Sequence, residues 1–222
     1  SLNLGNADAH GWLFFRCKEI IEETAKNKHS INSIKIHIKN FQSKIESFSN
    51  SERKKKILAK LKFFYKIINE KEEQYLKTEH KIESILEKSL TALLKYHTKG
   101  VFEVNNAKET WMDTEFDGDS RKGARIEVQA LRLNMYKLMF ELSLNQKYKI
   151  LENLLKNDLR QKFWNGRILA DGLDDFTIRP NLFIAAYAYP EFLSAKEWGI
   201  CFGSALKALW LGWGGLATIG KS

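Results

Sequence analysis

The chain has 222 residues, 44% of them hydrophobic, with a formal net charge of +9 and only two prolines, so it is long and apolar enough for one domain and favours a mostly helical protein. Cys17 and Cys201 are too few for a disulfide framework, which fits a reducing compartment and predicts a cytoplasmic protein. No apolar run reaches about 18 residues, so we expect no segment that spans a bilayer.

The first motif lies near the start of the chain, where Asp8 stands before a run with partly helical apolar spacing. An acidic residue at such a junction can accept hydrogen bonds from the first backbone N–H groups of a helix. The simplest interpretation is therefore that Asp8 caps a helix and that Trp12, one turn later, packs in the core.

Three amphipathic helices are predicted in the next part of the chain. Apolar residues recur every three or four positions from Ile31 to Phe48, and residues 49–51 interrupt the pattern. The same spacing predicts a second helix around Leu58–Ile68 and a third that starts around Thr78. We expect Gly100 to end the third helix and residues 101–104 to be extended.

The positive charge is concentrated in these helices. Residues 26–99 hold 18 Lys and Arg against 8 Asp and Glu, a net +10, whereas the remainder has 18 against 19, a net −1. A basic helical face can bind phosphates or lie on an anionic membrane. However, the lysines are spread along the helices rather than interleaved with exposed aromatics, and no nucleic-acid motif is present. We expect a solvated, elongated helical pair, with no membrane partner and with nucleic acid disfavoured.

The most informative segment is the loop around Trp111 and Asp113, which leads into a predicted helix. The indole offers a flat apolar face, and the carboxylate two residues on could protonate a glycosidic oxygen. A sugar-processing site needs such a pair. The alternative is that Asp113 is a helix cap or a solvated loop residue.

Two further helices are predicted after this loop. The first runs from about Ile126 to Phe140, with Glu127 in the first turn, where the helix dipole favours a carboxylate. The second includes Tyr148 to Leu155 and is interrupted at residues 163–166.

A turn-rich loop at residues 171–175 follows, and then Arg179-Pro180-Asn181 opens an apolar helix. Arg179 and Asn181 could hold Asp171 and the loop carbonyls together. We prefer this supporting role to direct contact with a sugar.

Three blocks of residues resemble the amylo-α-1,6-glucosidase half of glycogen debranching enzymes. Residues 110–113, Thr-Trp-Met-Asp, and 121–131, Arg-Lys-Gly-Ala-Arg-Ile-Glu-Val-Gln-Ala-Leu, resemble the family segment Thr-Trp-Met-Asp…Arg-x-Gly-x-x-Val-Glu-Ile-Asn-Ala-Leu. Residues 6–14 resemble its Thr-Ala-Asp-Ala-x-Leu-Trp-Phe. Toward the end, Phe-Trp-Asn at 163–165 and Ile-Arg-Pro-Asn at 178–181 occur in the family's order. Arg132 departs from the pattern, because the family usually has Trp there.

The resemblance implies an all-α fold that is part of an (α/α)6 toroid of the six-hairpin glycosidase type. We expect residues 1–222 to form a single α-helical domain that is a fragment of the catalytic half, with residues 26–99 as an elongated helical segment. The implied reaction releases glucose from α-1,6-linked glucosyl stubs of debranched glycogen or α-glucan with inversion, and Asp113 is the general acid. The resemblance implies that the sugar is bound by Asp8, Trp12, Trp111, Arg121, Glu127, Arg179 and Asn181.

The expected partner is therefore an α-glucan or glycogen oligosaccharide. The resemblance places the second catalytic carboxylate outside this chain, so a companion chain or domain could supply it, and we expect the chain alone to be inactive. We expect no cofactor and no metal, because no His-x-x-x-His or paired Cys motif is present. Two alternatives stay open: an inactive α-glucan-binding or scaffold protein of the same fold, and a basic helical module for nucleic acid or a membrane surface.

Overall fold

The computed structural model describes residues 7–46, 51–112 and 120–220. The helices are α1 (Ala9–Glu46), α2 (Ser51–Tyr96), α3 (Ile126–Ser143), α4 (Gln146–Phe163), α5 (Asn181–Ala188) and α6 (Ala195–Leu209), and the 3-10 turn η1 (Pro190–Phe192) lies between the last two. The short strands β1 (Thr98–Lys99) and β2 (Phe102–Glu103) pair antiparallel. The predicted all-α fold class is confirmed.

The chain forms two compact units. Residues 1–16 and 86–222 make up one, named here the α3 unit, and residues 17–85 make up the other, named the hairpin unit. The expectation of a single domain over 1–222 stays a prediction.

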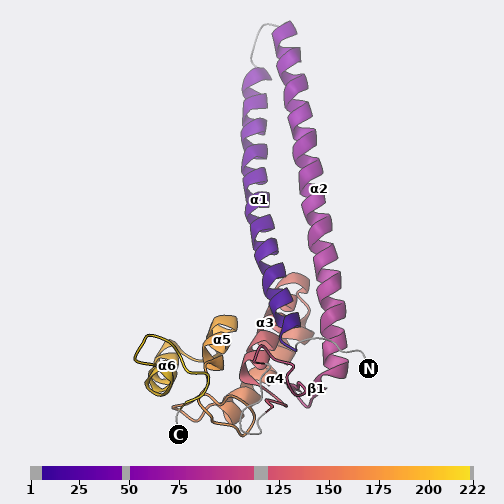
Figure 1. Ribbon diagram of the computed structural model, residues 1–222. Helices are drawn as coiled ribbons and strands as arrows, with labels where there is room; N and C mark the ends of the chain where they lie inside the picture. Colours follow the sequence, from indigo (N-terminus) through magenta and orange to yellow (C-terminus); the bar gives the residue numbers. More distant parts are fainter. Residues whose placement is uncertain (1–6, 47–50, 113–119, 221–222) are drawn as a thin grey trace. The chain divides into compact units, whose positions relative to one another are not determined.

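The hairpin unit consists of parts of α1 and α2, which lie antiparallel and side by side (Figure 1). Ion pairs join the two helices at Lys28 with Glu79 and at Lys35 with Glu72, the latter at 2.5 Å. The two glutamates are seven residues apart and therefore lie on the same face of α2.

The prediction of a third helix starting around Thr78 is wrong, because α2 is continuous from Ser51 to Tyr96. The chain has neither Gly nor Pro between Ser51 and Tyr96, so no residue with a strong helix-breaking tendency interrupts α2. Gly100 does not end the helix either. It lies in the turn between β1 and β2 with a φ of +63°, which Gly adopts at little cost.

The expectation that the lysines are not interleaved with exposed aromatic side chains is also wrong. Phe63 and Phe64 on α2 are 62% and 55% exposed, and they stand between Lys60, Lys62 and Lys66. Aromatic side chains are therefore interleaved with lysines on the surface of the hairpin unit.

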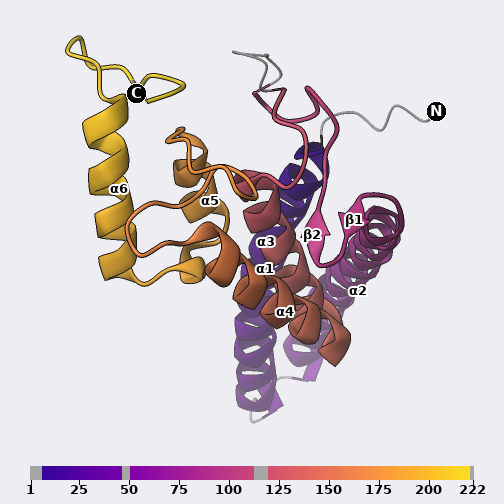
Figure 2. The same ribbon diagram turned by 90° about the horizontal axis from the view of Figure 1, so that it is seen from below.

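The α3 unit is built around its namesake helix, which contacts α4 and α5 (Figure 2). From Ile126 to Met139 every residue of α3 except Lys137 is buried. The predicted helices that correspond to α3, α4 and α5 are confirmed. Gly11 in α1 is needed for close packing, since a Cβ there would stand 2.5 Å from the Cβ of Leu131.

Polar side chains of α3 fix the β-hairpin. Gln129 accepts a hydrogen bond from the backbone N–H of Glu103 at 2.9 Å and donates to its carbonyl at 2.7 Å. Arg132, buried completely, donates from Nε to the Glu103 carboxylate at 2.7 Å. Arg132, which stands where the resembled family usually has Trp, therefore holds β2 against α3.

Among the described residues, no helix is both long enough and apolar enough to cross a membrane.

Candidate active site

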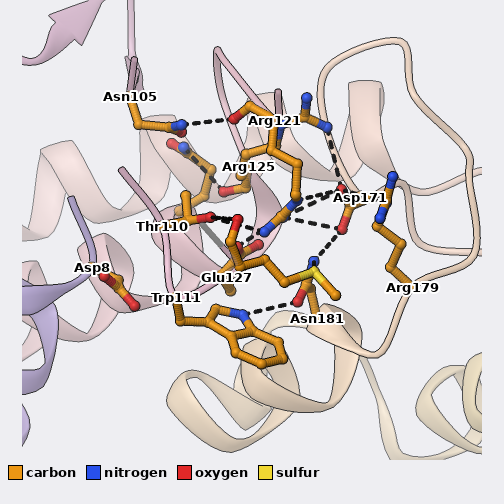
Figure 3. A network of polar contacts seen from close by, with 12 residues as sticks. Asp8, Asn105, Thr110, Trp111, Arg121, Arg125, Glu127, Asp171, Arg179 and Asn181 are labelled. Carbon is orange, nitrogen blue, oxygen red and sulfur yellow. Dashed lines mark hydrogen bonds and ion pairs between the residues drawn. The ribbon is translucent and has the colours of Figure 1, made fainter. Parts of the chain in front are cut away.

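Asp171, in the loop between α4 and α5, is the centre of a buried polar network (Figure 3). Arg121 donates to it from Nε and Nη2, each at 3.3 Å, and Arg125 donates from Nη1 at 3.2 Å. The Asn181 amide donates to Oδ1 at 2.6 Å, and the Arg179 guanidinium lies 3.6 Å from Oδ2. One carboxylate thus ties together three segments that are separate in the sequence.

Arg121 is the second centre of this network. It donates from Nη2 to Glu127 Oε1 at 2.8 Å and from Nη1 to Thr110 Oγ1 at 3.0 Å. Its φ is +53°, in the left-handed region that side chains other than Gly rarely adopt. Such strain of about 1–3 kcal/mol persists only where the surroundings fix the residue, and here the bonds to Asp171, Glu127 and Thr110 do so.

Glu127, in the first turn of α3, has no exposed surface. Burial raises the pKa of this carboxyl to about 7, and the charge of Arg121 opposes the rise only in part. Among the described residues, Glu127 Oε2 has no hydrogen-bond partner. A buried carboxyl that can hold a proton near neutral pH is typical of a functional site as well as of an ion-pair network.

Trp111 lies at the edge of the network and is 44% exposed. Its indole Nε1 donates to Asn181 Oδ1 at 2.9 Å, and the same Asn181 amide group donates to Asp171. Asn181 is the first residue of α5, so the helix start fixes the indole. The indole is thereby fixed one residue before Met112.

Asp8 is buried at the start of α1 and joins that helix to the Trp111 loop. Trp12 Nε1 donates to Asp8 Oδ2 at 3.4 Å. Burial raises the pKa of Asp8, whereas hydrogen bonds from the Trp12 side chain and the Trp111 backbone and the charge of Arg121 lower it. The predicted junction of loop and helix at Asp8 is confirmed.

The structure brings together most of the predicted site residues. Those in this one region are Asp8, Trp12, Trp111, Arg121, Glu127, Arg179 and Asn181. The supporting role expected for Arg179 and Asn181 agrees with their contacts to Asp171. Asp113 lies outside the described residues.

Sequence reasoning missed Asp171 as the centre, and it missed Arg125, which also pairs with Asp175 at 2.7 Å. Arg125 precedes the first residue of a helix that is buried on nearly all sides. A buried arginine directly before such a helix needs a carboxylate partner. The position of Arg125 is the one sequence signal that could have pointed to Asp171 and Asp175.

A groove of about 920 Å³ borders the network at Arg125 and Asp175 and is otherwise lined mainly by the β-hairpin, residues 122–124 and the end of α4. None of the predicted site residues within the described ranges lines it. We therefore place the candidate site at Trp111. The described residues include no group of three or more His, Cys, Asp or Glu side chains placed to hold a metal ion.

Comparison with known proteins identifies the family of this chain. A family model described as Amylo-alpha-1,6-glucosidase matches residues 22–221, which include the resembling blocks at residues 110–131 and 163–181 but not the block at residues 6–14. No curated protein and no solved structure matched the chain. Because the match spans most of the 222 residues, the chain belongs to the amylo-alpha-1,6-glucosidase family, with a glycosidase domain of the glycogen debranching type.

Proposed function

We propose that this chain binds α-glucan at Trp111 and contributes to the hydrolysis of α-1,6-linked glucosyl stubs, with inversion and release of glucose. The observation that carries the proposal is the fixed, exposed indole of Trp111, whose bond to Asn181 holds it two residues before Asp113. The family is of the six-hairpin glycosidase type, and we place this chain in part of an (α/α)6 toroid.

In the proposed mechanism Asp113 is the general acid that protonates the glycosidic oxygen. An inverting hydrolase needs a second carboxylate about 6.5–9.5 Å away to activate water on the opposite face of the sugar. We assign this group to a companion chain or domain. The sugar ring would stack on the indole of Trp111, so that the scissile oxygen lies near Asp113.

The buried members of the network act on the sugar through their neighbours. Glu127 and Asn181 have no exposed surface, and Arg121 is nearly as buried, so we assign them positioning roles. Arg121 fixes the loop between Thr110 and Asp171, and Asn181 fixes the indole. Asp8 and Trp12 would complete the sugar site from the start of α1.

The test is binding of an α-glucan that carries α-1,6-glucosyl stubs, measured at several salt concentrations. Trp111→Ala should weaken binding by about tenfold or more with little change in the melting temperature, because the side chain is partly exposed. Trp111→Phe keeps an aromatic face and should bind more tightly than the Ala variant. Trp213→Ala, at another exposed tryptophan, is the matched control.

If Trp111 belongs to the core instead, its removal should cost about 3–5 kcal/mol of stability and leave binding by the folded fraction intact. That result would reject the role in the sugar site. Binding of the glucan without any hydrolysis by the complete enzyme would favour the inactive glucan-binding alternative.

A second candidate function concerns the hairpin unit alone. The exposed Phe63 and Phe64 among lysines form a basic aromatic surface of the kind that binds single-stranded nucleic acid. Such binding would weaken steeply with salt, whereas stacking of a neutral glucan would not. The salt series therefore separates this function from the first.

A further inference from the structure

Tyr187, near the end of α5, presents an aromatic ring that the α3 unit holds in place but does not cover. The side chain is 64% exposed. Its ring stacks on that of Phe15 in α1, with 5.4 Å between the centroids and 16° between the planes. One face of the tyrosine ring is therefore supported, while much of its surface is open to solvent.

Trp12 extends this surface toward the candidate site. Its ring lies 5.8 Å from that of Phe15 and 6.4 Å from that of Tyr187, centroid to centroid. The three residues, Trp12, Phe15 and Tyr187, are named here the aromatic shelf. All three belong to the α3 unit.

Two polar connections join the shelf to Trp111. Asp8 accepts a hydrogen bond from the Trp12 side chain, and the backbone of Trp111 favours the charged form of the same carboxyl and lowers its pKa, so Asp8 lies between the two tryptophans. The Trp111 indole also donates to Asn181, which begins the eight-residue helix that carries Tyr187. The shelf and Trp111 are therefore fixed to each other from both sides.

We propose that the aromatic shelf binds the α-glucan chain to which the glucosyl stub is attached, while Trp111 binds the stub itself. This inference rests on the proposed function. A glucose ring has an apolar face of C–H groups that can stack on an aromatic ring, and its hydroxyl groups can bond to water or to the Tyr187 hydroxyl at the edge. Because the shelf is held before binding, little side-chain entropy is lost when the sugar stacks on it.

The composition of the shelf explains the choice of ligand. Its three aromatic rings offer apolar faces on which the C–H face of a neutral sugar can stack. It is continuous with the candidate site through Asp8, and a longer sugar chain is what a site for a branch stub must accommodate. The ligand class is a neutral α-1,4-linked gluco-oligosaccharide.

The experiment compares maltose with maltohexaose as ligands of the full 222-residue chain. Tyr187→Ala should weaken binding of maltohexaose by about tenfold and leave that of maltose nearly unchanged, because only the longer chain reaches the shelf. Tyr187→Phe should bind as the unchanged protein does. Tyr96→Ala is the matched control, since Tyr96 is 65% exposed and is not part of the shelf.

Tyr187→Leu keeps an apolar side chain over Phe15 and removes only the aromatic face. It should lose affinity for maltohexaose as the Ala variant does, and this keeps the test valid if Ala disturbs α5. Equal loss in Tyr187→Ala and Tyr96→Ala, or full affinity in Tyr187→Leu, would overturn the shelf while binding at Trp111 stands. If the unchanged protein binds neither sugar nor a stub-bearing glucan, the proposed function fails as well.

Discussion

The side-chain carbonyl of Asn181 accepts the indole N–H of Trp111 at 2.9 Å, although the two residues are 70 positions apart in the chain. The amide nitrogen of the same Asn181 donates to Asp171 at 2.6 Å. The buried network and the exposed indole are therefore joined through one side chain.

The first prediction concerns Asn181→Ala, which removes the acceptor of the Trp111 indole. The change also removes the hydrogen bond that Asn181 donates to Asp171. Loss of the bond that holds the Trp111 indole, worth about 0.5–1.5 kcal/mol, should lower glucan affinity by about two- to tenfold. Affinity and melting temperature are measured together. The control is Asn145→Ala. The Asn145 side chain caps α4 by accepting the backbone N–H of Lys147, so its loss should lower stability without changing glucan affinity.

The second prediction concerns Arg121→Met in the buried network. Glu127 and Asp171 would lose their shared cation, so unfolding free energy should fall by about 3–5 kcal/mol in chemical denaturation. Arg160→Met is the matched control at an ion pair with Glu197 near the surface, where solvent screens the charges and the loss should be much smaller. Equal losses in the two variants would show that Arg121 does not hold the site together.

The third prediction is a pH dependence from Glu127. Its pKa is about 7 in the folded protein against 4.5 in an ordinary environment. The folded protein therefore keeps a proton that the unfolded chain has released at intermediate pH. Stability relative to Glu127→Gln should be highest below about pH 4.5, fall as the pH rises, and level off above about pH 7.

The measurement for Glu127 is the melting temperature of both proteins across this pH range. Glu141→Gln, at an exposed position of α3, serves as the control and should run parallel to the unchanged protein. A difference between the unchanged protein and Glu127→Gln that is independent of pH contradicts the raised pKa.

The fourth prediction concerns the general acid. In any preparation that releases glucose, Asp113→Asn keeps the shape of the side chain and removes the proton, so the rate should fall by about 10²–10⁴-fold. Asp174→Asn is the control, because Asp174 is exposed and Asn tolerates its φ of +61°. Near-normal glucose release by the Asp113 variant would rule out its role as the acid.

The sequence alone was sufficient for the helices α3, α4 and α5 of this protein. Spacing of apolar residues every three or four positions predicted the helices from Ile126 and from Tyr148, and the proline before Asn181 marked the start of α5. These features depend on a few neighbouring residues, so the chain's own pattern is enough to show them. Short motifs in order also pointed to the family, which the match over residues 22–221 confirmed.

The continuity of α2 and the exposure of Phe63 and Phe64 were not predicted. When no Gly or Pro is present, the apolar face of a helix can move around the helix axis along its length while the helix itself stays continuous. In α2, the ion pairs of Glu72 and Glu79 with α1 stabilise the helix where the predicted break lay. Whether an aromatic side chain is covered depends on its neighbours in space rather than on its place in a pattern.

Apart from the contacts expected of Arg179 and Asn181, the network around Asp171 was decided by tertiary structure. Its members come from a loop before α3, the first turn of α3, a loop after α4 and the start of α5. Each appeared in the sequence as an ordinary polar residue near a helix end. Only packing of the helices around α3 removes water from these groups, and once buried they must bond to each other. The need to pair these buried groups depends on several segments at once, and it places Trp111 beside Asn181.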